Sequence, residues 1–290
     1  MGSYHFPMNI EVVGKYRATW GEGPVWWQGK LFYVDIEEHC VVSFDPTSGE
    51  EKKWDVGERV GFAVPRAGGG FVIGGDSGFR FLNEDGTIES IADLETDKPD
   101  NRLNDGKVSP EGELFGGSIS LVKKEGDASL YHLSARGEVK KVFGEVTNSN
   151  GLVWSEDGTR VFYIDTPRRE IWGFDYNKET QEWSNRTVVA KTDEIDASPD
   201  GMTIDADGHV WVAFCHGACV AQFDVVGGSL LQKIDLPCLE TTSCAFGGAN
   251  LDELYVTTGV HKSEVEEHAG RLLRITGLGV KGFPSVPFAG

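Results

Sequence analysis

The 290-residue sequence has few cysteines, no basic cluster and no long apolar run. Its five cysteines form an odd set without a CxxC pair, which argues against a disulfide framework and a thiolate zinc site. Lys and Arg number 27 against 46 Asp and Glu, and the net charge of −19 opposes binding to phosphate backbones or anionic membranes. There is no secretory signal and no membrane-spanning stretch of roughly 18 apolar residues. We therefore expect a cytoplasmic protein without nucleic-acid or membrane partners.

The sequence also lacks sustained helical periodicity, and a hairpin pattern takes its place. In Ser198 to Phe214 an apolar segment leads into the turn Asp205 to Gly208, and a β-rich run follows from Val210. Glycine supplies the positive φ that such turns need. This pattern predicts an all-β chain.

The hairpin pattern occurs six times along the chain. The second strands begin near Leu31, Phe71, Leu114, Val161, Val210 and Leu254. Spacings of roughly 40 to 49 residues are the period of four-stranded propeller blades. Since one blade cannot bury its own faces, the repeats predict a single six-bladed β-propeller over residues 9–290, with a flexible tail over residues 1–8. The strand Ile10 to Thr19 is expected to complete the blade that contains the strand Arg271 to Lys281, which closes the ring.

Oxygen-bearing side chains precede four of the turn glycines at nearly equal offsets. Asp200, Asn150 and Asn104 lie eight residues before Gly208, Gly158 and Gly112, and Glu22 lies seven residues before Gly29. Innermost propeller strands line the central channel, so these side chains are expected to converge at one mouth. Carboxylate and amide oxygens suit Ca²⁺, Mg²⁺ or Mn²⁺, and Zn²⁺ in an open site is compatible. Any one of these residues alone is also an ordinary turn or bulge residue.

Five stretches connect the sequence to a known family. They are GEGPVW (21–26), NRLNDGKVSPEG (101–112), SNGLVWS (149–155), PDGMTIDADGHVWVA (199–213) and the tail from TTSCAFGG (241–248) to ITGLGVKG (275–282). In these stretches the chain resembles the senescence marker protein, regucalcin, gluconolactonase and luciferin-regenerating enzyme family. The resemblance implies a six-bladed propeller with one divalent metal at the channel mouth.

The resemblance also implies roles for individual residues. By position, the metal ligands would be Glu22, Asn150 and Asp200. Arg102 and Asn104 match a segment that contacts the substrate or supports the metal, whereas Asp105 beside them is expected to be structural. Family enzymes hydrolyse sugar lactones. The metal would polarise the lactone carbonyl or a water, and Asp200 would act as general base.

Several alternatives remain open at the level of sequence. The loop Ser120 to Ala128 is short and has Val122 near the position of a sugar-binding acid in vertebrate relatives, which does not support polyol binding there. His216 follows a blade strand and is either a mouth residue or a surface histidine without a role. The same site would also suit a luciferin-regenerating or organophosphate hydrolase. A non-catalytic calcium-binding propeller is the alternative outside enzymes, and a closed propeller is compatible with a monomer.

Overall fold

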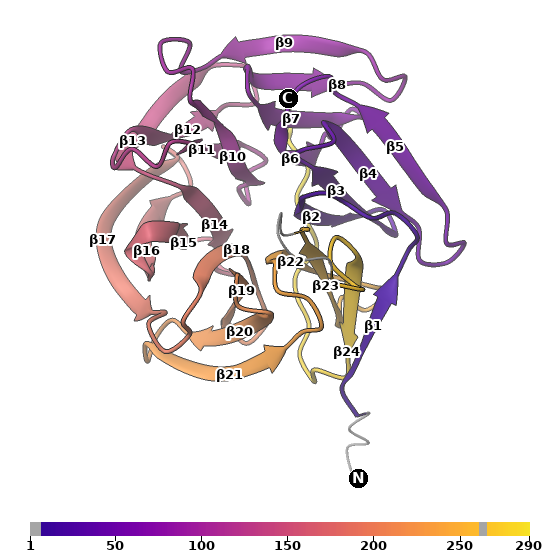
Figure 1. Cartoon of the computed structure of the whole chain (residues 1–290). Helices are drawn as coiled ribbons and strands as arrows, with labels where there is room; N and C mark the ends of the chain where they lie inside the picture. The colour runs from indigo at the N-terminus through magenta and orange to yellow at the C-terminus, as the bar shows by residue number, and fades with distance from the viewer. Residues whose placement is uncertain (1–6, 261–265) are drawn as a thin grey trace.

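Six antiparallel sheets of four strands each surround a central axis in the computed structural model, which describes residues 7–260 and 266–290 (Figure 1). This arrangement confirms the predicted six-bladed propeller. Of the expected N-terminal tail, residues 1–6 lie outside the described residues, and Pro7 and Met8 precede the first strand without regular structure. Within the described residues, no helix is long and apolar enough to cross a membrane.

Five blades are each formed by four consecutive strands. Blade 1 comprises β2 (Gly21–Trp27), β3 (Lys30–Asp35), β4 (Cys40–Phe44) and β5 (Glu51–Asp55). Blade 2 comprises β6 (Val60–Pro65), β7 (Phe71–Gly75), β8 (Gly78–Leu82) and β9 (Ile88–Asp93). Blade 3 comprises β10 (Asn101–Val108), β11 (Leu114–Ser120), β12 (Ala128–Leu133) and β13 (Val139–Val146). Blade 4 comprises β14 (Ser149–Trp154), β15 (Arg160–Asp165), β16 (Glu170–Asn177) and β17 (Glu182–Lys191), with the 3₁₀ turn η1 (Thr166–Arg168) after β15. Blade 5 comprises β18 (Ser198–Ile204), β19 (Val210–Cys215), β20 (Cys219–Asp224) and β21 (Ser229–Asp235).

Blade 6 joins the two ends of the chain. It comprises β22 (Thr241–Gly247), β23 (Glu253–Thr258), β24 (Leu272–Thr276) and β1 (Asn9–Val13). Strand β1 pairs antiparallel with β24 from Asn9 opposite Thr276 to Val13 opposite Leu272, which confirms the predicted ring closure. Closure matters because it removes the open sheet edge that would otherwise pair with another chain.

Both terminal strands are shorter than the sequence predicts. Strand β1 ends at Val13 and not at Thr19, because Gly14 adopts a φ of 71° and turns the chain away. The N–H groups of Lys15 and Tyr16 then donate to the Glu51 carboxylate, at 2.9 to 3.1 Å, instead of to a strand. Strand β24 ends at Thr276 and not at Lys281.

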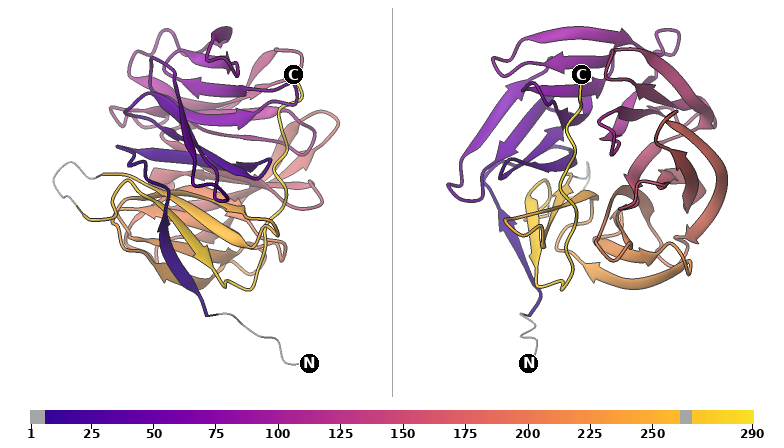
Figure 2. Two further views of the ribbon diagram at one scale, coloured as in Figure 1. Left: turned by 90° about the vertical axis from the view of Figure 1, so that its right-hand side faces the viewer. Right: turned by 180° about the vertical axis from the view of Figure 1, so that it is seen from behind.

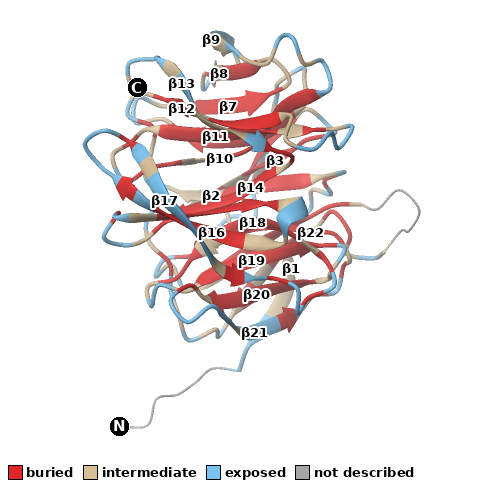
Figure 3. Ribbon diagram, turned by 90° about the vertical axis from the view of Figure 1, so that its left-hand side faces the viewer, coloured by how far each residue is buried: buried red, intermediate tan, exposed pale blue. Residues whose placement is uncertain are grey.

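The core lies between the blades as well as within them. Inner strands are buried on both faces because each blade packs against two neighbours, whereas outer strands such as β17 and β21 are mostly exposed (Figure 3). Trp211 of blade 5 is fully buried and meets Phe246 of blade 6 edge-on, with ring centroids 6.1 Å apart. Burial of one such aromatic side chain contributes about 1.5–3 kcal/mol. The inter-blade contacts therefore stabilise the ring as one unit.

Every innermost strand contains a β-bulge near the same end. The register shifts fall between Glu22 and Val25, Val60 and Phe62, Leu103 and Asp105, Asn150 and Leu152, Pro199 and Met202, and Thr241 and Ser243. A bulge leaves a residue without a cross-strand partner and redirects its side chain. Neighbouring inner strands also contact one another all round the channel. Six bulges, with the residues beside them, therefore lie in a ring at one mouth.

The chain after β24 crosses the opposite mouth of the channel. Its backbone is tied to blades 5 and 6, where the N–H of Ala206 donates to the carbonyl of Lys281 and that of Gly282 to the carbonyl of Leu251. Further along, the N–H of Phe288 donates to the carbonyl of Pro65, at 2.8 Å. Figure 2 shows this segment running across the back of the ring from the blade 6 side to the blade 2 side.

Candidate metal centre

The bulges bring together the four oxygen-bearing residues that the sequence singles out. Glu22 comes from β2, Asn104 from β10, Asn150 from β14 and Asp200 from β18. All four are at least nine-tenths buried, with exposures of 5%, 9%, 3% and 8% respectively. Burial of this many polar groups is costly unless each has a partner or a bound ligand.

Two carboxyl groups from different blades face each other in this cluster. The side chains of Glu22 and Asp200 lie within hydrogen-bonding contact. Burial, reinforced by the charge of nearby Asp105, raises the pKa of Glu22 to about 8, although the Gly23 N–H donates to its Oε2 at 2.6 Å. Burial and the Glu22 charge likewise raise the pKa of Asp200 well above its usual value. Two ionised carboxylates cannot remain in contact here at neutral pH without a proton or a cation between them.

A chain of hydrogen bonds fixes the amide of Asn150 beside this pair. The Nδ2 of Asn104 donates to Asn150 Oδ1 at 3.1 Å, and the Nδ2 of Asn150 donates to Thr166 Oγ1 at 2.8 Å. Thr166 Oγ1 in turn donates to the carbonyl of Pro199, the residue before Asp200, at 2.9 Å. Because both ends of the amide are engaged, its carbonyl oxygen has a defined direction. The chain links blades 3, 4 and 5.

Asn104 is itself held from several sides. Arg102 Nη1 donates to Asn104 Oδ1 at 2.8 Å, and Asn104 Nδ2 also donates to the carbonyl of Ser149 at 2.8 Å and to Asn148 Oδ1 at 3.2 Å. The amide N–H groups of Asn104 are therefore already used within the protein. This arrangement suits a residue that positions Asn150.

Arg102 provides the fixed positive charge of the cluster. Its side chain is 8% exposed, and burial lowers its pKa to about 10, so the guanidinium stays charged at neutral pH. Nη1 is engaged with Asn104 and the carbonyl of Leu103. Nε is buried and has no hydrogen-bond partner among the described residues. A buried charged donor without a partner is the kind of group that a ligand oxygen satisfies.

Glycines after the polar residues allow the blades to approach this closely. A Cβ on Gly151 would lie 2.8 Å from the carbonyl oxygen of Asp200, and a Cβ on Gly201 would lie 2.8 Å from Cα of Ser243 and closer still to its side chain. Both distances are shorter than any ordinary carbon contact. The repeated pattern of a polar residue followed by glycine therefore serves the bulge and the inter-blade contact together.

The residues present fit a divalent cation. The donors are two carboxylates and one amide carbonyl from three blades, all oxygen, which is the chemistry that Ca²⁺, Mg²⁺ and Mn²⁺ prefer. The two carboxylates would balance the charge of a dication. A cation would also replace the proton that the contact between Glu22 and Asp200 otherwise requires. Asp105 lies close enough for its charge to raise the pKa values of both carboxyl groups; its Oδ1 accepts the Gly106 N–H at 2.7 Å, and burial raises its own pKa.

A second group of possible ligands lies at the same end of blade 5. Ser198 pairs with Cys215, so His216 follows at the end of β19 nearest Asp200. His216 Nδ1 is 2.9 Å from Glu240 Oε1, and Cys215 Sγ donates to Glu240 Oε2 at 3.1 Å. Burial raises the pKa of the Cys215 thiol, which keeps it protonated and disfavours metal binding. The hydrogen bonds to Glu240 indicate that Cys215 and His216 have a structural role here.

The sequence does not identify Thr166 or Glu240 as part of this region. Thr166 begins the 3₁₀ turn after β15, and Glu240 precedes β22 in an irregular segment. Neither residue belongs to the repeated hairpin, and no local motif marks them. Only the closed ring brings them beside Asn150 and His216.

Fold and site together define a six-bladed β-propeller with a buried cluster of oxygen donors at one mouth of its channel. A family model described as SMP-30/Gluconolactonase/LRE-like region matches residues 20–260. Regucalcin from Gallus gallus is 38% identical over 98% of this chain and 99% of its own length. The chain therefore belongs to the SMP-30, gluconolactonase and luciferin-regenerating enzyme family.

Solved structures agree with this assignment. A luciferin-regenerating enzyme superposes with a TM-score of 0.91 and 34% identity, covering 98% of this chain and 100% of that one. A calcium-binding protein, regucalcin, from Agrobacterium tumefaciens superposes with the same TM-score and 25% identity, covering 98% and 99%. The likeness extends over the whole propeller, including the blades that carry the polar cluster.

Proposed function

We propose that this protein is a metal-dependent hydrolase that opens sugar lactones. The main support is the contact between the buried carboxyl groups of Glu22 and Asp200 beside the oriented amide of Asn150. This is a costly arrangement for a protein that binds no cation. Membership of a family that includes gluconolactonases supports the choice of reaction.

Glu22, Asn150 and Asp200 would hold the ion. A bound divalent cation would polarise the lactone carbonyl or lower the pKa of a water at this site. Asp200 would take the proton from the attacking water as general base, because its carboxyl group would lie beside the cation and remain ionised there. Asn104 would keep the Asn150 oxygen in place.

Arg102 is the residue we propose to orient the substrate. Its Nε–H has no partner among the described residues, and its positive charge suits an oxygen that gains negative charge during ring opening. The loop of residues 120–128 contributes less to a polyol, because Val122 is 61% exposed and Lys124 pairs with Asp127 of the same loop at 3.0 Å. We therefore expect recognition to depend on the channel mouth more than on this loop.

Elemental analysis and a hydrolysis screen test the proposal. The purified protein should contain about one divalent ion per chain, and a pH-indicator assay over five- and six-membered lactones should show activity that EDTA abolishes. Asp200→Asn should lower kcat/KM by at least about 10²-fold, which is the scale of a lost general base. The exposed carboxylate Asp252, changed to Asn, is a matched control that should leave activity unchanged.

The same experiment separates the alternatives. A luciferin-regenerating activity is supported by the likeness to the enzyme of that name, and it would appear as no turnover of any lactone but metal-dependent turnover when nitriles are added to the screen. A calcium-binding protein without catalysis is supported by the name of the Agrobacterium tumefaciens relative and by the all-oxygen donor set. Bound calcium together with no turnover in the screen would favour that function over ours.

A further inference from the structure

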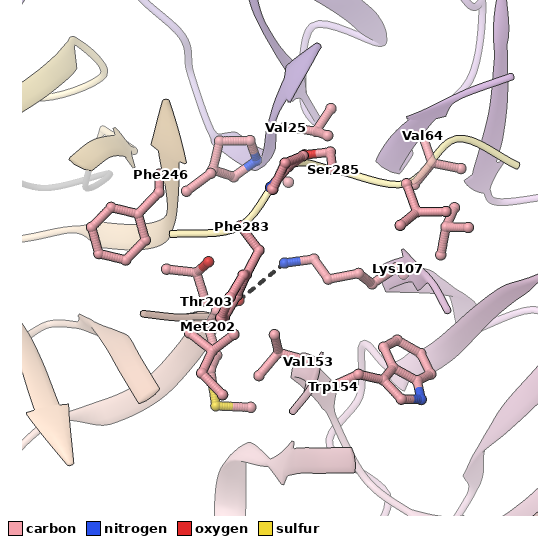
Figure 4. Close-up of a pocket in the computed structure, with 18 of the residues that line it drawn as sticks. Val25, Val64, Lys107, Val153, Trp154, Met202, Thr203, Phe246, Phe283 and Ser285 are labelled. Atoms are coloured by element: carbon pink, nitrogen blue, oxygen red, sulfur yellow. Dashed lines mark hydrogen bonds between the residues drawn. The ribbon is translucent and has the colours of Figure 1, made fainter. Parts of the chain in front are cut away.

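A cavity of about 290 Å³ lies inside the ring at the end opposite the metal centre. The inner strands contribute Val25, Val64, Val153 and Phe246, all from the part of each strand that follows its bulge (Figure 4). Glu22 and Asn150 lie at the other ends of β2 and β14 and do not line this cavity, although it extends to Gly23 and Asp105, which neighbour Glu22 and Asn104 in the chain. At roughly 30 Å³ per small group, the volume admits a molecule of about ten non-hydrogen atoms.

One ammonium group projects into this mostly apolar space. Lys107 lies on β10, and its Nζ reaches across the channel to donate to the carbonyl of Met202 on β18 at 3.1 Å (Figure 4). An ammonium carries three N–H donors, and within the described residues Nζ forms no ion pair with a carboxylate. Asp105 also lines the cavity, but its Oδ1 accepts the Gly106 N–H of its own strand. Burial lowers the pKa of Lys107, while the negative charges of Asp105 and Glu22 act against that shift. With one hydrogen bond to Met202, the Lys107 ammonium has further N–H donors for a ligand.

The segment after β24 forms the outer wall of the cavity. Phe283, Pro284, Ser285 and Val286 line it, and Phe283 and Ser285 are drawn near the end of the Lys107 side chain in the close-up (Figure 4). This wall is held at both ends by the backbone hydrogen bonds of Gly282 and Phe288. Phe288 is buried, with 1% exposure, so this segment is packed against the propeller. Small pockets of this type, apolar with few polar groups, are the usual form of ligand sites.

We propose that this cavity is a second binding site, for a small monocarboxylate with a compact apolar body. The carboxylate would accept hydrogen bonds from Lys107 Nζ and the Ser285 hydroxyl, on the side away from Asp105. The apolar body would pack against Val153, Phe246 and Phe283. A charged group among apolar walls discriminates well between ligands, because a neutral analogue leaves the ammonium desolvated without an anion.

Ligand-observed NMR titration with benzoate tests this site, because benzoate combines a carboxylate with a flat apolar body of suitable size. The metal-loaded protein should bind benzoate, and should bind the neutral isostere benzamide at least about tenfold more weakly. Lys107→Met removes the charge but keeps the length of the side chain, and should weaken benzoate at least about tenfold. The matched control is Lys123→Met, which removes an exposed lysine and should leave the affinity unchanged.

Two further arms keep the test decisive. Ser285→Phe fills the cavity from the wall, outside every strand, and should also weaken benzoate at least about tenfold even if Lys107→Met does not fold. Binding should persist after EDTA treatment, because the site is distinct from the metal centre. No binding at about 10 mM benzoate, equal binding of benzamide, unchanged affinity in Ser285→Phe, or loss of binding with EDTA would each overturn the proposal. None of these outcomes depends on lactone hydrolysis.

Discussion

Replacing Gly201 with alanine tests whether the approach of two blades positions the metal centre. Gly201 follows Asp200 in the bulge of β18, and an added Cβ would lie 2.8 Å from Cα of Ser243 on β22. The Ser243 side chain could rotate away, but its Cα could not. Ordinary carbon contacts are about 3.5–4.0 Å, so β18 and β22 would have to separate locally by about 1 Å.

The expected cost follows from this displacement. Overpacking a rigid contact costs typically 1–3 kcal/mol, and the backbone of Ser243 as the obstacle puts Gly201→Ala near the upper end, at about 3 kcal/mol. With an unfolding entropy of about 2.1 cal/mol/K per residue, this corresponds to a melting temperature lower by about 5 °C. A misplacement of about 1 Å beside Asp200 should also lower kcat/KM about 10²-fold.

Gly208→Ala is the matched control in the same hairpin. Gly208 lies in the turn between β18 and β19, where a Cβ would have nothing within 4 Å but would have to adopt a φ of 85°. The left-handed backbone alone costs about 1 kcal/mol, so its melting temperature should fall by about 1 to 2 °C with activity retained. Calorimetry, lactone assays and metal titration of both variants decide the matter. A Gly201→Ala protein that melts and binds metal like the unchanged protein would refute the argument.

Three other predictions concern the site and the core. Asn104→Ala should lower activity or metal affinity by about 10- to 100-fold, less than the loss of Asp200, because Asn104 acts through Asn150; equal and mild losses from both would contradict these roles. The five cysteines are buried, and burial raises their pKa values, so Ellman's reagent at pH 8 should label them only after denaturation. Burial lowers the pKa of His132, so the unfolded chain binds its proton more readily and stability should fall as the pH drops below about 6.5. His132→Gln should show a shallower fall in melting temperature over that range, and an identical pH profile would contradict the argument.

The hairpin repeat alone was sufficient to predict the architecture. The turn glycines Gly29, Gly112, Gly158 and Gly208 do adopt positive φ values of 79°, 83°, 63° and 85°. Because the same hairpin pattern occurs six times, misassigning one of the repeats would not change the predicted fold. Ring closure was also predictable, since an unpaired strand remained at each end of the repeats and a propeller leaves only one place for them.

The details that could not be predicted depend on contacts between distant segments. The early end of β1 depends on Gly14 and on a carboxylate supplied by Glu51 of another blade. Thr166 is recognisable as part of the site only when its hydroxyl is seen between Asn150 and the carbonyl of Pro199. Nothing in the sequence distinguishes Lys107 from other strand residues. Its hydrogen bond to the carbonyl of Met202 depends on β10 and β18 facing each other across the channel.

Differences among the six blades explain why a symmetric ring has an asymmetric site. The six bulges lie at equivalent places, yet the bulge on blade 2 is formed by Gly61 next to the apolar Val60, and neither side chain offers an oxygen. On blade 6, the Thr242 hydroxyl donates to the carbonyl of Gly21 at 2.5 Å, so it supports the residue before Glu22 rather than the centre of the ring. Oxygen-bearing side chains are therefore left on blades 1, 3, 4 and 5, and those on blades 1, 4 and 5 are the candidate cation ligands. The inner strands of all six blades approach one point on the channel axis. The residue at each bulge determines whether that blade presents a carboxylate, an amide or an apolar side chain there.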